Sequence, residues 1–305
     1  MSRSMFATEE IKTLRIESYL KYVCNKAGIE LTGYQLERHF EPEKVSRDEE
    51  SKAIRRSCKY DRYIRQSVCP NQQTASLIET KAKGSTEILH SPIWHVLDCI
   101  KSERDLEHSI LNLHPQIQIE LFEAKRNAAN QHVRKLLTSK SLENIMTSGD
   151  LHGVCGLLIL LFGTDKALLK ISKISIEKSL VEMLLNLAAT TYPDELVWNI
   201  YQCVAPYLTQ RAKSKTLTYS EFEFKVVQKN KLLTIAANED YIMYIDEQYR
   251  FLTLMFHGNT QLIKRELKTT IKGRTNKELK VRNLIWLLKK LNNTRTYADK
   301  RQFLI

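Results

Sequence analysis

Hydrophobic residues recur at intervals of three and four along most of the chain, which is the spacing of amphipathic helices. The first such segment covers residues 8–27, between Thr8, a favoured N-cap residue, and Gly28, a helix terminator. Its apolar positions are Ile11, Leu14, Ile16, Tyr19, Leu20 and Val23. A second helix is predicted between Thr32, which can cap it, and Pro42, which stops it.

The same periodicity continues almost to the C-terminus and predicts a mostly α fold, with a bundle of helices after the first hundred residues. The further expected helices are 52–67, 71–80, 91–102, 103–113, 117–137, 141–146, 151–170, 175–190, 193–213, 247–256, 260–271 and 277–291. Between residues 219 and 245 the pattern fits short strands as well as helix, so a short β element is predicted there as an alternative.

Two domains are expected from this pattern. Residues 1–102 form the first, with a charged insert at 41–51 that lacks an apolar stripe and is predicted to be a loop. Residues 103–305 form the second, a helical domain that ends in basic helices at 260–293. Nine Gly and six Pro in 305 residues are few helix breakers, which also favours helix over sheet.

The formal charge of +12 is concentrated at the C-terminal end. Residues 262–305 contain 13 Lys and Arg against 3 Asp and Glu, whereas residues 1–100 contain 16 against 14. A concentrated cationic segment attracts polyanions, of which nucleic acid is the commonest. The alternative is a solvated helix rich in lysine. The residues expected to contact a polyanion here are Lys280, Arg282, Lys289 and Lys290.

A second group of basic residues lies in the predicted helix at 52–67, at steps of three and four that place them along one helix face. The candidates for nucleic-acid contact are Arg55, Arg56, Lys59, Arg62 and Arg65. Arginine can form two hydrogen bonds with guanine, and lysine can neutralise phosphates. The competing interpretation is a solvated basic face on a structural helix.

Residues 31–94 resemble the DNA-binding module of lambda-repressor/Cro-type (XRE-like) regulators. The resemblance lies in Tyr-Gln-Leu-Glu-Arg-His-Phe at 34–40, in Lys59-Tyr60-Asp61 with Tyr63, and in Pro70 followed by Leu77-Ile78-Glu79. It implies a helix-turn-helix whose helix at 52–67 enters the DNA major groove. It also implies a regulatory protein of a bacterium or mobile element, similar to bacterial proteins that carry such a module in front of a longer helical chain.

Other chemistry is less marked. His95 and Cys99 stand one helical turn apart, with His90 nearby, but a fourth zinc ligand is missing, so separate core and surface residues are the preferred interpretation. No catalytic or phosphate-binding motif is present, and we expect neither an enzyme nor a cofactor. Six scattered cysteines, no signal peptide and no apolar run of membrane-spanning length favour a cytoplasmic protein without integral membrane association.

The expected function is therefore nucleic-acid binding, with DNA preferred to RNA. The alternative is a non-enzymatic helical interaction or scaffold protein whose N-terminal module no longer binds DNA. The apolar side of the helix at 277–291 can pack on the bundle, form a homodimer interface, which suits a two-fold DNA site, or lie on a membrane surface as a peripheral helix. A third interpretation is a catalytic domain at about 105–260, with polar residues such as His108, His152 and Glu182 as its candidates.

Overall fold

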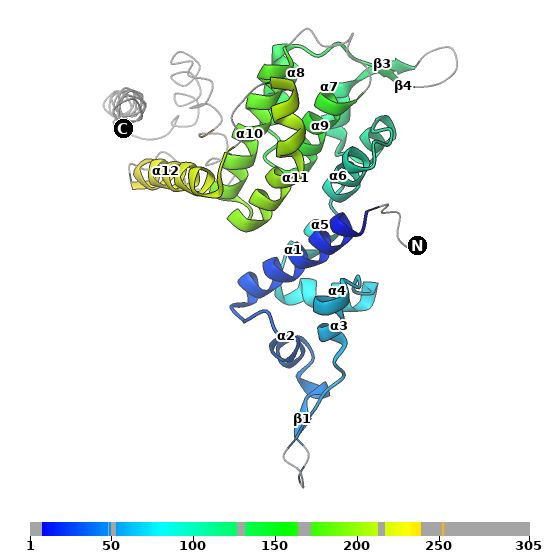
Figure 1. The fold of residues 1–305 in the computed structure, drawn as a ribbon, viewed down its shortest axis with the longest axis vertical. Coiled ribbons are helices and arrows are strands. Elements are labelled where there is room, and N and C mark those ends of the chain that lie inside the picture. The colour runs from blue at the N-terminus through cyan, green and yellow to red at the C-terminus, as the bar shows by residue number, and fades with distance from the viewer. Residues whose placement is uncertain are drawn as a thin grey trace, which may run out of the picture. The chain divides into compact units, whose positions relative to one another are not determined.

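The computed structural model describes residues 8–47, 49, 53–126, 132–163, 172–212, 217–238 and 252. Within them the chain is mostly α-helical, as the hydrophobic pattern predicts (Figure 1). The α-helices are α1 Glu9–Ala27, α2 Gly33–Phe40, α3 Lys59–Gln66, α4 Gln72–Lys81, α5 Ser85–His90, α6 Ile93–Lys101, α7 Pro115–Leu121, α8 Ser139–Met146, α9 Leu151–Phe162, α10 Lys173–Thr190, α11 Asp194–Ala212 and α12 Tyr219–Asn238.

Short 3₁₀ helices and strands complete these elements. The 3₁₀ helices are η1 Pro42–Lys44 and η2 Glu107–Asn112. Strands β1 Ser46–Arg47 and β2 Ile54–Arg55 pair antiparallel, with Ser46 opposite Arg55. Strands β3 Phe122–Arg126 and β4 His132–Arg134 form a second antiparallel pair.

The chain packs as two compact units. The first comprises Met1–Val181 and Pro193–Thr216, and the second comprises Glu182–Tyr192 and Leu217–Ile305. The domain boundary expected between residues 102 and 103 falls inside the first unit. The expected division into two domains at that point stays a prediction. In the described part of the second unit, Phe222 and Val226 of α12 are buried, and Lys229 of α12 pairs with Glu182 of α10.

Helix α1 forms as the sequence predicts but begins by a different contact. The Thr8 side chain makes no cap hydrogen bond within α1; instead its hydroxyl and its amide donate to Oδ1 of Asp98 at 2.6 and 2.9 Å. Asp98 is completely buried on α6 and also binds Arg104. Gly28 ends the helix in the left-handed region, at φ 65°, which glycine adopts without strain. A buried carboxylate therefore joins α6 to the start of α1.

The first five helices share one core. Its fully buried members come from α1, α2, α3, α4 and α5, and they include Tyr19, Leu36, Tyr60, Ile78 and Leu89. Figure 1 shows α4 directly below α1, with α2 and α3 farther below. Because α2, α3 and α5 have eight, eight and six residues, each is too short to be stable alone and depends on this core.

The turn between α4 and α5 depends on Glu79. Its carboxylate accepts hydrogen bonds from the Gly84 and Thr86 amides, both at 2.7 Å, and from the hydroxyls of Ser85 and Thr86. Gly84 has φ 86°, and a Cβ atom there would lie 2.8 Å from the hydroxyl of Tyr22, so only glycine fits. Burial raises the pKa of Glu79, but these hydrogen bonds lower it by more, and the net pKa lies below 4.5.

This shift predicts acid sensitivity. Because the folded pKa of Glu79 is lower than its unfolded pKa, its contribution to stability is complete above about pH 4.5 and is lost as the pH falls through the folded value. We expect the free energy of unfolding, measured in urea, to fall between pH 7 and pH 3.5, and by less in Glu79→Gln. An equal fall in the variant and the wild type would contradict this role for Glu79.

Several expectations about elements need correction or refinement, among them the helix expected at 103–113, of which residues 107–112 form the 3₁₀ helix η2. The helix expected at 52–67 is wrong in its first half. Residues 54–55 form strand β2, and the helix begins at Lys59. Cys58 has φ 55°, a left-handed conformation that interrupts a helix, and Ser57 is held by Glu37 of α2. The insert at 41–51 is not a plain loop, because η1 and β1 lie within it.

The expected helix at 117–137 was wrong beyond Leu121, where the chain turns into strands β3 and β4. Between Phe122 and Val133 the only apolar residues are alanines, so a continuous helix would have little large apolar surface to bury. In the segment 219–245, residues 219–238 are helical and residues 239–245 lie outside the described part. The β elements that exist in the described residues are elsewhere.

Among the described helices, none combines the length and the apolar character that crossing a bilayer requires.

Candidate nucleic-acid interface

Helix α3 is fixed to the core by two tyrosines on one of its faces. Tyr60 is fully buried and Tyr63 is 8% exposed, and their rings meet edge to face with centroids 5.6 Å apart. Ile64 is partly buried against the same core. At 100° per residue these three side chains share one side of the helix, which turns the opposite side to solvent.

That solvent side carries Arg62 and Arg65, which we call the α3 arginine face. Both side chains are exposed, and neither forms an ion pair with any described residue. They stand at i and i+3, so their Cβ atoms lie about 5–6 Å apart. The one acidic residue of α3, Asp61, is held 2.6 Å from the guanidinium of Arg56. The charge of this face is therefore purely cationic.

Arg56 and Lys59, two of the five N-terminal candidates, are placed differently from the prediction. Nη1 of Arg56 lies 2.6 Å from Oδ2 of Asp61 and 3.9 Å from Oε2 of Glu37. Nζ of Lys59 pairs with Glu41 and lies 3.3 Å from the Thr74 hydroxyl. Both cations are thus committed to carboxylates within the fold, which corrects the expectation that all five basic residues share one outward helix face.

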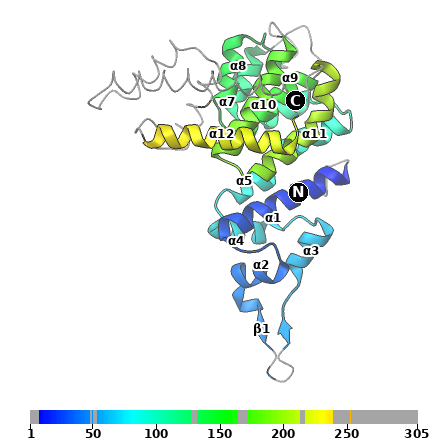
Figure 2. The same ribbon diagram turned by 60° about the vertical axis from the view of Figure 1, so that its left-hand side comes forward.

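Arg55 lies on strand β2 rather than on a helix. It is exposed and stands opposite Ser46 in the β1–β2 ribbon. Both strands are exposed along their whole length, and Figure 2 shows the ribbon running away from α2 and α3. Arg55 is therefore near α3 along the chain but projects from a different element.

Glu37 of α2 and Glu41, the residue that directly follows α2, organise this region, and the sequence reasoning missed them. Glu37 is fully buried, and its Oε1 accepts hydrogen bonds from the Ser57 amide, at 2.7 Å, and from the Ser57 hydroxyl. Glu41 is 4% exposed and pairs with Lys44 and Lys59. A usable signal was present: Glu37 falls within the inward stripe of α2, beside Leu36 and Phe40, where an acid needs a partner.

These contacts shift the titration of neighbouring groups. Burial raises the pKa of Glu41, but hydrogen bonds from Lys44 and Lys59 lower it by more, so the net direction is down. Burial, together with the charge of Glu41, raises the pKa of Tyr60. Glu41 is therefore ionised and Tyr60 neutral at neutral pH, which keeps the ion pair with Lys59 intact.

A further contact lies at the N-terminus of α2. A Cβ atom on Gly33 would lie 2.4 Å from Oδ1 of Asp61, so the absence of a side chain at residue 33 lets the Asp61 carboxylate approach the first turn of α2. Helix N-termini favour negative charge. Asp61 therefore stabilises α2 and neutralises Arg56 at the same time.

The four C-terminal candidates, Lys280, Arg282, Lys289 and Lys290, lie outside the described residues. The basic helices expected at 260–293 lie there too, so the structure neither places nor removes this part of the predicted interface.

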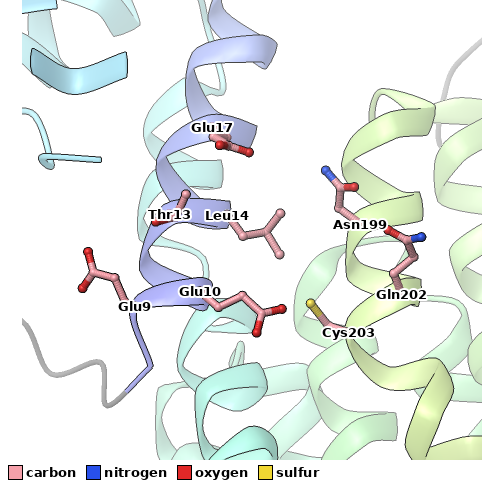
Figure 3. A pocket seen from close by; sticks show the side chains of 8 residues that line it. All are labelled: Glu9, Glu10, Thr13, Leu14, Glu17, Asn199, Gln202 and Cys203. Carbon is pink, nitrogen blue, oxygen red and sulfur yellow. The ribbon is translucent and has the colours of Figure 1, made fainter. Parts of the chain in front are cut away.

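A cleft of about 460 Å³ lies between α1 and α11, and its chemistry is opposite to that of the α3 arginine face. Figure 3 shows Glu10, Leu14 and Glu17 of α1 pointing toward α11. The cleft is lined by Glu9, Glu10, Thr13, Leu14, Glu17, Asn199, Gln202 and Cys203. The lining holds three carboxylates and no basic residue, and two of the carboxylates, those of Glu9 and Glu10, pair with Lys12 and Lys101.

The other residues considered for metal binding or catalysis make contacts within the fold. Sγ of Cys99 lies 3.7 Å from Nε2 of His95, and burial lowers the pKa of His95. The described residues contain no group of three or more His, Cys, Asp or Glu side chains placed to hold a metal ion. Nδ1 of His152 accepts a hydrogen bond from the His114 amide at 3.0 Å, which joins α9 to α7.

Comparison with protein-family models, with curated proteins and with solved structures found no match to this chain. The resemblance of residues 31–94 to XRE-like modules therefore stays a prediction.

Proposed function

We propose that this protein binds nucleic acid, duplex DNA in preference to RNA, through the α3 arginine face. One observation carries the proposal: Arg62 and Arg65 are exposed and unpaired among the described residues, on a helix whose other face is anchored by Tyr60 and Tyr63. Unpaired cations on a rigid element can bind phosphates or base edges without breaking contacts in the protein.

The dimensions of α3 favour duplex DNA. An α-helix such as α3, with its side chains, is about 10–12 Å across, which matches the width of the B-DNA major groove, about 12 Å. The corresponding groove of A-form RNA is too deep and narrow for a helix to read. Arg62 and Arg65 would then face the groove, with Arg55 on the adjoining ribbon near the phosphates.

The C-terminal basic residues would add affinity that does not depend on sequence. The segment 262–305 carries 13 Lys and Arg, among them Lys280, Arg282, Lys289 and Lys290, and each neutralised phosphate releases counterions. A homodimer on a two-fold DNA site and a cytoplasmic location remain part of the proposal.

The experiment is a binding titration of the full chain with a fluorescent 20-base-pair duplex, and with an RNA duplex of the same length, across a salt series. We expect binding to DNA whose logarithmic affinity falls steeply with the logarithm of salt concentration, by about 0.9 for each phosphate contacted. Equal affinity for the two duplexes would contradict the preference for DNA. No binding at low salt would contradict the proposal as a whole.

The second candidate is a non-enzymatic interaction protein, and a separate surface favours it. Leu111 of η2 and Ile119 of α7 are 51% and 64% exposed, which is high for large apolar residues. The side chain of Gln118, next to Ile119, donates a hydrogen bond to the Leu111 carbonyl at 3.1 Å, which ties α7 to η2. Absence of duplex binding would leave a protein partner at this surface as the better proposal.

A further inference from the structure

Helix α3 is locally strained at both ends. The residues that flank it, Cys58 and Ser67, have φ values of 55° and 49°, in the left-handed region that side chains disfavour. The side chain of Cys58, the N-cap residue, makes no cap hydrogen bond, and the amide of Lys59 instead donates to the Ser57 hydroxyl at 3.4 Å. A helix of eight residues with such ends would not form from its own sequence, so contacts from elsewhere must impose it.

Those contacts come from α2 as well as from the core. Oε1 of Glu37 binds the amide and the hydroxyl of Ser57, directly before the strained Cys58. Glu41, one turn further along, pairs with Lys59, the first residue of α3. We call Glu37 and Glu41 the carboxylate clamp. The clamp therefore fixes the chain on both sides of Cys58, whose φ is in the left-handed region.

We infer that the carboxylate clamp holds α3 in an ordered state that is required to present Arg62 and Arg65, so that Glu37 and Glu41 are positioning residues for ligand binding. The inference rests on the proposed function, which supplies its ligand, duplex DNA. The ordering of α3 can be measured without DNA. Loss of the clamp would shift α3 toward a disordered state, and apparent affinity falls in proportion to the ordered fraction.

This inference predicts that removing an acidic charge weakens DNA binding, whereas simple electrostatics predicts that it strengthens DNA binding. Removing an acidic charge near a phosphate-binding surface normally strengthens binding, because the surface becomes more positive. Glu37→Gln and Glu41→Gln both remove such a charge, and Glu41→Gln also frees Lys44 and Lys59. If the clamp orders α3, both substitutions should nevertheless weaken binding. Glu43→Gln is the matched control, since Glu43 is exposed on η1 and pairs with no described residue.

The test combines hydrogen exchange of the full chain with duplex binding. In Glu37→Gln we expect the amides of residues 59–66 to exchange about tenfold faster while those of α1 stay protected, and the affinity for a 20-base-pair DNA to fall about tenfold. Glu41→Gln should behave likewise, and it replaces Glu37→Gln if that variant fails to fold. Glu43→Gln should leave exchange unchanged.

A substitution that relieves the backbone strain at residue 58 should restore the ordered α3. Glycine adopts φ 55° without penalty, so Cys58→Gly combined with Glu37→Gln should restore slow exchange and affinity, whereas Cys58→Ala should not. Unchanged exchange of residues 59–66 in both clamp variants would overturn the inference, as would loss of protection in α1 to the same extent. If the wild type binds no duplex, the proposed function fails, and the exchange measurement still decides whether the clamp orders α3.

Discussion

Reversing both charges of the α3 arginine face, in the double variant Arg62→Glu with Arg65→Glu, should lower the affinity for duplex DNA about a hundredfold or more. Each arginine that contacts DNA contributes roughly 1–3 kcal/mol, and the two contributions act together. Because both side chains are exposed and unpaired among the described residues, the fold should be preserved. The salt slope should also decrease by about two, one for each lost phosphate contact.

The matched control reverses two exposed lysines elsewhere, in Lys140→Glu with Lys225→Glu. This control changes the net charge by the same amount but leaves α3 intact. If both double variants weaken binding equally, the effect is one of total charge, and the α3 arginine face is not the docking element. Binding that is unchanged in both variants would move the site to the basic segment 262–305.

Replacing Trp94 by alanine should have the largest effect on stability, a loss of about 3–5 kcal/mol in the free energy of unfolding. Trp94 is 1% exposed on α6, and its indole nitrogen donates a hydrogen bond to the Ile88 carbonyl at 2.6 Å. The substitution leaves a cavity and removes the partner of that carbonyl.

Urea unfolding measures this loss, with Ile119→Ala as the control. Ile119 is 64% exposed, so the same kind of truncation should cost less than about 0.5 kcal/mol. Similar small losses in both variants would show that Trp94 is not a core residue. The indole hydrogen bond is separated from the packing by Trp94→Phe, which should lose less than Trp94→Ala.

Local signals predicted those parts of the fold that depend on neighbouring residues. Gly28 ends α1, Thr32 caps α2 by accepting a hydrogen bond from the Gln35 amide, and Asn71 precedes α4 and accepts one from the Thr74 amide. In each case the signal and the structure lie within four residues of each other, so the sequence alone contains the interaction.

The parts that were wrong depend on contacts between distant residues. The helix expected from residue 52 fails because Glu37, 20 residues earlier, binds Ser57, and because β2 pairs with β1. Helical spacing correctly placed Arg62 and Arg65 on one exposed side. It could not show that Arg56 lies near Glu37 and that Lys59 pairs with Glu41, since these residues meet only in the folded chain.

The candidate interface is thus smaller than the sequence suggested but better defined. Of the five basic residues between 55 and 65, Arg56 and Lys59 stabilise the fold, Arg55 lies on the ribbon, and Arg62 and Arg65 face solvent from α3. The division follows from burial and pairing rather than from residue type. Charge counting alone therefore overstates the number of arginines and lysines that a ligand can use.

The most direct measurement is site-specific photocrosslinking to a labelled DNA duplex. A photoreactive benzophenone side chain is placed at Gln66, an exposed residue one turn beyond Arg62 on α3, and in a second variant at Gln116, an exposed residue of α7. Nucleic-acid binding through the α3 arginine face predicts a strong crosslink from residue 66 that salt abolishes, and little from residue 116. A duplex that binds the protein but crosslinks no more from residue 66 than from residue 116 would contradict it.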